Sequence, residues 1–309
     1  MNGKWIRDLR AQMPKLQTEE QAPMSDYTSF RIGGPAECMV FPASEEEMAS
    51  VLRFVREREL PWLLLGAGSN VLAPDEGLDG VVIQTKRAMQ GLHPAADDPE
   101  ALVAMCGVAL SRLSVFAAQR GLTGLEFAQG IPGTVGGGVV MNAGAYGGEM
   151  KDCAVQTWTL TAEGSQISYL GEEQGFRYRG SAISDDGNSV CAVRFRLRRG
   201  DPEQILETMQ DFAARRREKQ PLDLPSAGST FKRPEGGYAA ALIDRAGLKG
   251  LTVGGAAVSE KHAGFVVNLG GATADDVKRL IGLIQERVLE TSGISLEPEV
   301  RILRGREKA

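Results

Sequence analysis

Residues 130–149 read GIPGTVGGGVVMNAGAYGGE, a stretch dense in glycine that contains no lysine and no arginine. It is not a Walker A loop, because that motif needs a G-K-[ST] sequence whose lysine reaches a terminal phosphate. Glycine lets the backbone approach a ligand closely, and successive inward-pointing amides bind an anion without side-chain charge. The stretch therefore predicts a pyrophosphate-containing cofactor that stays bound, with a ligand-free array of β-turns as the alternative.

The composition is that of an ordinary globular protein. The 309 residues are 42% hydrophobic and 24% charged, enough chain for two or three domains. The net charge of −5 argues against a nucleic-acid-binding surface, which needs clustered positive charge. Cys38, Cys106, Cys153 and Cys191 form no C-x-x-C pair, so we expect reduced thiols and no metal site.

The first sixteen residues, MNGKWIRDLRAQMPKL, place charges among their apolar positions. This pattern predicts a short amphipathic helix rather than a signal peptide. No apolar run reaches the roughly 20 residues that a membrane span requires. We therefore expect a cytoplasmic protein that is neither exported nor embedded in a membrane.

The local patterns are typical of α/β or α+β domains. The sequence SEEE at 44–47 is a capping box followed by apolar residues at helical spacing, which predicts a helix over 44–59. The run WLLL at 62–65 predicts a buried strand, and DGVVIQT at 79–85 a second one. Further predicted elements are strands at 101–106, 153–162, 190–199, 262–269 and 294–304, and helices at 111–121, 202–219, 240–247 and 273–291.

The composition changes near Gly200, where we expect a domain boundary. The first predicted domain covers 1–200, in two parts of about 1–90 and 91–200. The second covers 201–309, and its last strand is a candidate to return to the first domain.

The sequence GAGSNV at 66–71 follows the strand WLLL and has three interpretations. A dinucleotide-binding fingerprint needs a third glycine, but Val71 stands at that position. A plain tight turn fits the preference of Gly, Ser and Asn for turns. A phosphate-contacting turn of another fold is the third interpretation.

Seven motifs in a fixed order carry a resemblance that covers nearly the whole chain. They resemble those of the UDP-N-acetylenolpyruvoylglucosamine reductase family, in its shorter subtype. The motifs are TSFRIGGPA (28–36), GAGSNVL (66–72), GLEFAQGIPGTVGGGVVMNAGAYGGE (124–149), FRYRGSA (176–182), SAGSTFKRP (226–234), HAGFVVN (262–268) and LEPEVRIL (296–303).

The resemblance implies an FAD-binding domain of the p-cresol methylhydroxylase and vanillyl-alcohol oxidase type, followed by a smaller α+β substrate domain. It implies noncovalent FAD, because His93 and His262, the only histidines, lie outside the predicted FAD loops. The residues that would contact FAD are Arg31, Gly33, Gly66, Gly68, Ser69, Asn70, Gly133, Thr134, Gly136, Gly137, Asn142 and Gly144.

The resemblance also implies a reaction in two halves. NADPH would reduce FAD, and UDP-N-acetylglucosamine enolpyruvate would then be reduced to UDP-N-acetylmuramate, a precursor for peptidoglycan, cell wall, cell shape and cell division. Hydride addition to the alkene pushes negative charge onto the carboxylate, so the site must stabilise an enediolate and protonate the neighbouring carbon. We expect a monomer without metal, nucleic-acid or membrane partners.

Three residues match the family's catalytic positions. Arg179 would bind the substrate carboxylate, although a lone arginine is more often a surface ion-pair partner. Ser229 would donate the proton, although a Gly/Ser turn is the simpler interpretation of its loop. Glu299 would help to stabilise the enediolate, and by spacing alone it equally suits an exposed Glu297–Glu299 pair bridged by Arg301.

Two features leave the substrate contacts open. The motif SAGSTFKRP has Arg233 where some members of the family have asparagine. The chain is also too short for the extra loop, with its substrate-covering tyrosine, of longer members. Tyr146 and Tyr238 are therefore only weak candidates for contacting the substrate.

Two other functions compete with the reductase. The flavin-type loops alone would also suit an oxidase of the same superfamily that passes electrons from a sugar or alcohol to oxygen. The third interpretation is a degenerate nucleotide-binding module without catalysis.

Overall fold

The computed structural model describes residues 3–305, which pack as two compact units. Unit 1 contains residues 3–20, 38–67 and 80–215, and unit 2 contains 21–37, 68–79 and 216–305. The chain leaves unit 1 for the last time after Arg215, inside the helix α7 (Pro202–Lys219). Two earlier segments, 21–37 and 68–79, also belong to unit 2. The domain limits at 200 and 201 stay a prediction.

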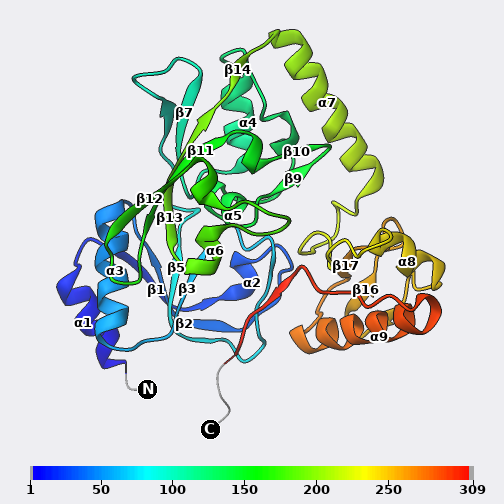
Figure 1. Cartoon of the computed structure of the whole chain (residues 1–309). Helices are drawn as coiled ribbons and strands as arrows, with labels where there is room; N and C mark the ends of the chain where they lie inside the picture. Colours follow the sequence, from blue (N-terminus) through cyan, green and yellow to red (C-terminus); the bar gives the residue numbers. More distant parts are fainter. Residues whose placement is uncertain (1–2, 306–309) are drawn as a thin grey trace. The chain divides into compact units, whose positions relative to one another are not determined.

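Residues 17–84 contribute a four-stranded sheet. Its strands lie in the order β1 (Gln17–Pro23), β2 (Pro35–Phe41), β5 (Leu78–Gln84) and β3 (Trp62–Leu65). Figure 1 shows the helices α1 (Lys4–Gln12) and α3 (Glu45–Glu57) close together, and their buried residues share one hydrophobic core cluster. The strands β3 and β5 run parallel, with Trp62 opposite Val81.

The helix predicted over 44–59 is confirmed in α3. Ser44 is its N-cap, and the Ser44 hydroxyl accepts a hydrogen bond from the Glu47 amide at 3.2 Å. This bond satisfies one of the amides that a helix start leaves without a partner. Val51, Leu52 and Val55 are buried on the inner face, as the helical spacing predicts.

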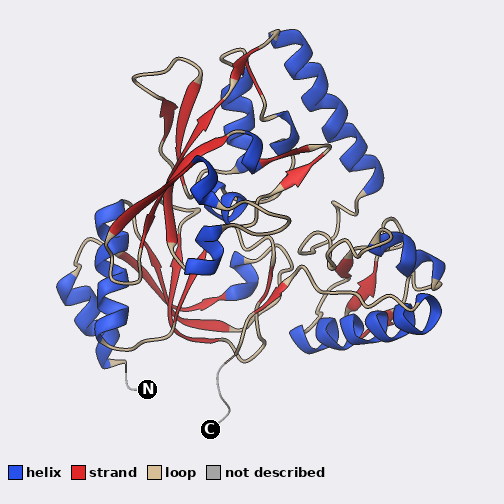
Figure 2. Cartoon of the chain, viewed as in Figure 1, coloured by secondary structure: helices blue, strands red, loops and turns tan. Residues whose placement is uncertain are grey.

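A five-stranded antiparallel sheet forms the centre of unit 1 (Figure 2), in the order β12 (Gln166–Leu170), β11 (Ala154–Leu160), β13 (Ser189–Arg196), β7 (Ala101–Met105) and β6 (Leu92–Pro94). The strand predicted at 190–199 is confirmed in β13, where the alternating residues Cys191, Val193 and Phe195 are buried. The strand β12 was not predicted, because only Tyr169 of its five residues is buried.

Short elements surround this sheet. They are α4 (Leu110–Ala118), α5 (Val135–Val140), α6 (Ala182–Asp186), the 3-10 turns η1 (Glu126–Ala128), η2 (Met150–Asp152) and η3 (Gly171–Gln174), and the strand pairs β8 (Leu122–Thr123) with β14 (Arg198–Arg199) and β9 (Gly144–Ala145) with β10 (Gly148–Glu149).

The glycine-rich stretch contains a helix that its composition did not predict. Glycine is a poor helix former, but α5 is held by close packing. A Cβ at Gly136 would lie 2.9 Å from the Cβ of Cys106, and one at Gly138 would lie 3.1 Å from a methyl group of Leu110. Part of the glycine content therefore serves close packing against β7 and α4.

Unit 2 contains a three-stranded antiparallel sheet, β15 (Thr252–Val253), β16 (Ala256–Val258) and β17 (Val266–Asn268), with helices α8 (Ala239–Arg245) and α9 (Ala274–Ser292). The buried residues of α8, α9 and the sheet form one core cluster. The early segments add α2 (Met24–Tyr27) and β4 (Val71–Leu72), and β4 pairs in parallel with β18 (Arg301–Ile302).

The final strand predicted at 294–304 is wrong in its length. Only Arg301 and Ile302 form a strand, and Pro298 makes one isolated bridge with Phe231. Proline has no amide hydrogen to donate, so a regular ladder cannot run through it. Within residues 3–305, no helix combines the length and apolar character needed to cross a membrane.

Candidate active site

A buried hydroxyl without a protein partner lies in the glycine loop. The Thr134 side chain is 2% exposed, and its Oγ1 has no hydrogen-bond partner among the described residues. A Cβ on Gly66 would lie 2.4 Å from this oxygen, so the Gly66 backbone approaches it closely. Unsatisfied buried hydroxyls are costly, which points to a ligand group at this position.

The amides around α5 divide into two groups. The Val135 and Gly136 amides donate to the carbonyls of Val108 and Cys106, at 2.8 and 2.9 Å. The amides of Gly133, Thr134 and Gly137 have no acceptor in the part of the chain that the structure describes. Only this second group is therefore available to a cofactor.

Asn142 is fully engaged by the protein. Its Nδ2 donates to Glu149 Oε2 at 2.5 Å and to the Arg177 carbonyl at 3.2 Å. Its Oδ1 accepts a hydrogen bond from the Lys151 amide at 3.0 Å, and the residue is 2% exposed. Both side-chain donors are thus committed within the protein, although Asn142 was predicted to contact FAD.

A two-residue turn carries the predicted catalytic arginine. Arg177 and Gly180 exchange backbone hydrogen bonds at 3.0 and 3.2 Å, and Tyr178 and Arg179 form the turn between them. Arg179 has a φ of +55°, in the left-handed region that non-glycine residues seldom adopt. Such backbone strain gathers at functional sites, where the surrounding structure enforces it.

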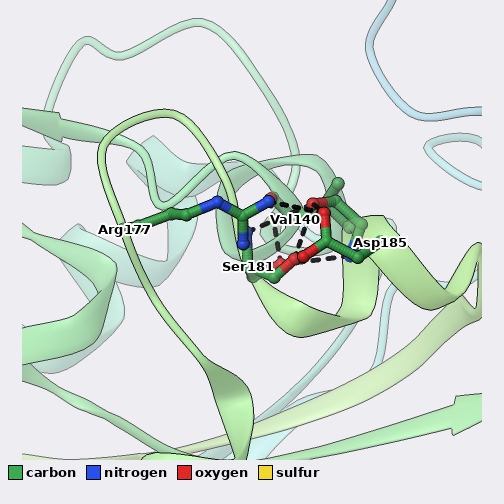
Figure 3. Close-up of polar contacts among 5 residues, drawn as sticks. Val140, Arg177, Ser181 and Asp185 are labelled. Carbon is green, nitrogen blue, oxygen red and sulfur yellow. Dashed lines mark hydrogen bonds and ion pairs between the residues drawn. The ribbon is translucent and has the colours of Figure 1, made fainter.

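Figure 3 shows how the turn is anchored. Arg177 reaches across to form an ion pair with Asp185, and the Ser181 hydroxyl donates to the Val140 carbonyl at 3.0 Å. The Arg177 guanidinium also covers Gly180, where a Cβ would lie 3.0 Å from its Cζ. Arg177 therefore has a structural partner in Asp185, and Arg179 lies half-buried at the turn.

Ser229 and Glu299 lie on two crossing segments of unit 2. The Glu299 amide donates to the Thr230 carbonyl at 2.8 Å, and the Lys232 amide donates to the Glu297 carbonyl at 2.8 Å. Glu297 forms an ion pair with Lys232, a partner that the alternative of a Glu297–Glu299 pair bridged by Arg301 did not include. Ser229 is thus adjacent to the residue that binds the Glu299 backbone.

The turn GAGSN (66–70) contacts the segment that contains Glu299. Asn70 Nδ2 donates to the Glu299 carbonyl at 3.2 Å, and the Arg301 amide donates to the Asn70 carbonyl at 3.0 Å. The Ser29 hydroxyl donates to the Ser226 carbonyl at 2.6 Å, and the Ser29 amide to the Gly68 carbonyl at 3.1 Å. These four motifs therefore meet within unit 2, at what we call the crossing (residues 29, 68–70, 226–231 and 297–301). The motif HAGFVVN contacts it as well, because the Gly264 carbonyl accepts a hydrogen bond from the Thr230 amide at 2.8 Å.

The remaining predicted cofactor residues fall in both units. In unit 2, Gly68 has a φ of +62° and lies so close to the Tyr27 carbonyl that a Cβ would be 2.0 Å from it. Gly33 and Ser69 also belong to unit 2, as does the exposed Arg31 with its φ of +55°. Gly144, in β9, belongs to unit 1.

The structure brings the predicted residues together in two sets. Unit 1 holds Arg179 with the glycine loop, Gly66, Thr134 and Asn142. Unit 2 holds Ser229 and Glu299 with Asn70 and Gly68. Sequence reasoning missed Ser29 and Glu149 as residues that support the site, although both stand inside the quoted motifs.

The thiol next to the glycine helix is inert. Burial raises the pKa of Cys106 to about 12, and all four cysteines are buried and free. A thiol held protonated is a poor nucleophile. The Cys106 thiol is therefore no candidate for a nucleophile in this region.

Two family profiles match the chain. Residues 36–169 match an FAD binding domain, and residues 220–303 match the UDP-N-acetylenolpyruvoylglucosamine reductase C-terminal domain. Among curated proteins, the UDP-N-acetylenolpyruvoylglucosamine reductase of Syntrophomonas wolfei is 45% identical over 94% of this chain and 96% of its own length. The protein of the same name from Clostridioides difficile is 45% identical over 94% and 95%.

Solved structures agree with these matches. The crystal structure of the reductase from Thermus caldophilus is 36% identical, with a TM-score of 0.78 over 94% of this chain and 99% of that one. A Phl p 4 variant described as a glucose oxidase has a TM-score of 0.50 and 14% identity, and covers 64% of this chain and 44% of that one. That second likeness shows a shared fold alone, over the part of this chain that it covers.

Proposed function

The chain belongs to the UDP-N-acetylenolpyruvoylglucosamine reductase family, and on that premise we propose how its own residues serve the reaction. It is an FAD-dependent oxidoreductase of peptidoglycan synthesis that reduces UDP-N-acetylenolpyruvoylglucosamine. Bound FAD supplies the reversible hydride chemistry that links a nicotinamide donor to the enolpyruvyl alkene. NADPH is the proposed donor.

The observation that carries the proposal is the crossing. Thr230 binds the Glu299 backbone at 2.8 Å and directly follows Ser229 in the chain, so the two predicted catalytic residues have a common backbone support. Ser229 donates a proton to the carbon next to the carboxylate. A serine hydroxyl is a weak acid, but an enediolate carbon is basic enough to take its proton.

Glu299 stabilises the charge that develops on the carboxylate during reduction. As a neutral acid it would donate a hydrogen bond to the enediolate oxygen, which requires a site that disfavours its ionised form. Asn70 holds the Glu299 backbone through the 3.2 Å bond to its carbonyl. This bond fixes the backbone from which the Glu299 side chain would reach the substrate.

Arg179 binds the substrate carboxylate. Its planar guanidinium can form two parallel hydrogen bonds to a carboxylate, and these strengthen as that group gains negative charge. The left-handed backbone at Arg179 supports a functional role, because a plain surface arginine would gain nothing from that strain. The neighbouring Arg177 is already paired with Asp185.

The residues that would hold FAD in unit 1 fit a polar, close-fitting ligand. The Thr134 hydroxyl has no partner among the described residues, and the Gly133, Thr134 and Gly137 amides are available beside it. Hydrogen-bond donors without charge suit a pyrophosphate or a flavin ring that stays bound. In unit 2, Gly68, Ser69 and Asn70 are the proposed contacts, with Arg31 and Gly33.

An anaerobic stopped-flow experiment tests the function. NADPH should bleach the flavin absorbance, and UDP-N-acetylglucosamine enolpyruvate should then restore it. Both substrates would use one flavin in turn, so we expect ping-pong kinetics. Steady oxygen consumption with a sugar, without bleaching by NADPH, would instead establish a flavin oxidase.

We further propose that the protein acts as a cytoplasmic monomer that binds neither nucleic acid nor membranes. Its net charge of −5 would repel nucleic-acid phosphates. Size-exclusion chromatography with light scattering tests the monomer, and a mass twice that of the chain would contradict it.

A further inference from the structure

Both ends of the turn that carries Arg179 are tied to the residues just after the glycine helix. At its first residue, the Arg177 carbonyl accepts a hydrogen bond from Asn142 Nδ2 at 3.2 Å. Just beyond its last residue, the Ser181 hydroxyl donates to the Val140 carbonyl at 3.0 Å. Val140 ends α5, so the same short helix is connected both to the amides of the glycine loop and to the arginine turn.

Of the two residues that bind the turn, Asn142 is more constrained than Ser181. Its backbone is left-handed with φ +42°, and the residue is buried. Glu149 accepts one of its two Nδ2 hydrogens and is itself paired with Lys151, which fixes the orientation of the amide. The other hydrogen points to the Arg177 carbonyl, whose residue pairs with Gly180 across the turn.

We propose that Asn142 is a positioning residue that holds the Tyr178–Arg179 turn through its hydrogen bond to the Arg177 carbonyl. This inference rests on the proposed role of Arg179 in binding the substrate carboxylate. It assigns to Asn142 a function different from the predicted contact with FAD. The strained turn keeps its shape because the carbonyl at its base is held by this buried amide.

Two substitutions separate the two donations of Asn142. Glu149→Gln keeps an acceptor oxygen for Nδ2, so both donations survive in this variant. Asn142→Asp has nearly the same shape but removes both donors. Combined with Glu149→Gln, the new carboxylate at position 142 can accept from the new amide at position 149. In the double variant the hydrogen bond between positions 142 and 149 is kept, with position 149 as the donor and position 142 as the acceptor. Relative to Glu149→Gln, the hydrogen bond to the Arg177 carbonyl is lost.

The experiment measures binding of two UDP-sugars to the FAD-loaded protein by calorimetry. UDP-N-acetylmuramate carries a carboxylate, and UDP-N-acetylglucosamine does not, so the ratio of their affinities reports on Arg179. Glu149→Gln should keep the wild-type ratio. The double variant Asn142→Asp/Glu149→Gln should lower it about tenfold, because the Arg177 carbonyl loses the hydrogen bond from Asn142 and the turn relaxes.

Dependence on Arg179 gives the decisive control. Arg179→Ala should abolish the preference for the carboxylated sugar, and in that background the double variant should lower the ratio no further, because both changes act on the same contact. A double variant that keeps the wild-type ratio, while Arg179→Ala lowers it, would overturn this inference alone. An unchanged ratio in Arg179→Ala would overturn both it and the proposed role of Arg179.

Folding is monitored independently through FAD. Each variant should be yellow and should bind UDP-N-acetylglucosamine as the wild type does. Loss of that binding together with loss of FAD would show that Asn142 maintains the fold in general, which would also overturn a specific role in positioning Arg179. Ser181→Ala, which removes the second tie, should lower the affinity ratio in the same direction.

Discussion

The turn that carries Arg179 and the crossing that carries Ser229 and Glu299 are held in place by different means. The turn depends on side chains, Asn142 and Ser181, that bind main-chain carbonyls 35 and 41 residues away in the sequence. The crossing is built mainly from backbone hydrogen bonds between segments such as Thr230 and Glu299. Side-chain changes should therefore displace the turn, whereas at the crossing they should change the chemistry and leave the backbone in place.

Replacing Ser229 by alanine should have the largest effect and gives the clearest test of this difference. We expect flavin reduction by NADPH to stay near wild type and reoxidation by the enolpyruvyl substrate to slow by about 10²- to 10⁴-fold, the usual contribution of a general acid. Stopped-flow absorbance measures both rates. Ser226→Ala is the matched control, because only the Ser226 carbonyl is used by Ser29. Equal losses in both half-reactions would show that Ser229 is structural.

Gly66→Ala should have the next largest effect, in unit 1. The new Cβ would lie 2.4 Å from Thr134 Oγ1, so the side chain or the backbone must move. We expect a loss of about 1–3 kcal/mol in FAD binding, typical of overpacking. Fluorescence titration of the apoprotein with FAD measures it. In the control Gly137→Ala the new Cβ would meet nothing closer than 3.9 Å, and a similar loss there would contradict the packing argument.

Thr134→Val should separate apoprotein stability from cofactor affinity. Removing a buried hydroxyl that has no described partner should raise the unfolding free energy of the apoprotein by about 1 kcal/mol. The same change should weaken FAD binding, because the ligand loses a hydrogen bond. Denaturant unfolding with and without FAD measures both. A variant that is destabilised without FAD would show that Thr134 already has a partner in the protein.

His262 should give the smallest effect, which depends on pH and is confined to unit 2. Burial lowers the pKa of His262, and the neutral ring accepts the Gly264 amide at Nδ1, 3.1 Å away. The Gly264 carbonyl in turn accepts the Thr230 amide at 2.8 Å. Because the folded pKa is lowered, the neutral His262 ring contributes to the free energy of unfolding above the unfolded pKa of 6.5. This stabilisation is lost as the pH falls through the lower folded pKa.

Thermal unfolding between pH 7.5 and roughly 5 tests this effect, because the unfolded imidazole titrates in that range. His262→Gln should show a shallower decline in melting temperature than the wild type. Identical slopes would mean that protonation of His262 does not disturb the loop beside the crossing.

Local signals in the sequence were sufficient for elements held by their own residues. The Ser44–Glu47 pattern predicted the start of α3, where the Ser44 hydroxyl caps the Glu47 amide, and WLLL predicted β3 at its observed limits. The helix predicted at 202–219 matches α7. The glycine-rich α5 was missed because its stability comes from packing against Cys106 and Leu110, which no local propensity records.

The candidate site was predictable in its residues but not in its assembly. Ordered motifs pointed to Arg179, Ser229 and Glu299, whose roles remain predictions. Nothing in the spacing showed that Asn70 would bind the Glu299 carbonyl, 229 positions away, or that the Asn142 amide would be used by the protein. Such contacts depend on tertiary structure, which a single sequence does not reveal.

The parallel pairing of β4 with β18 has a consequence for how the chain folds during synthesis. Residues 68–79 leave the ribosome well before their partners in 216–305, which follow on the order of ten seconds later at bacterial or slower elongation rates. Meanwhile the unpaired backbone of β4 is exposed to the wrong partners. Unit 2 can close only when the last strand emerges, so a truncation before Arg301 should produce a nascent chain that depends on chaperones.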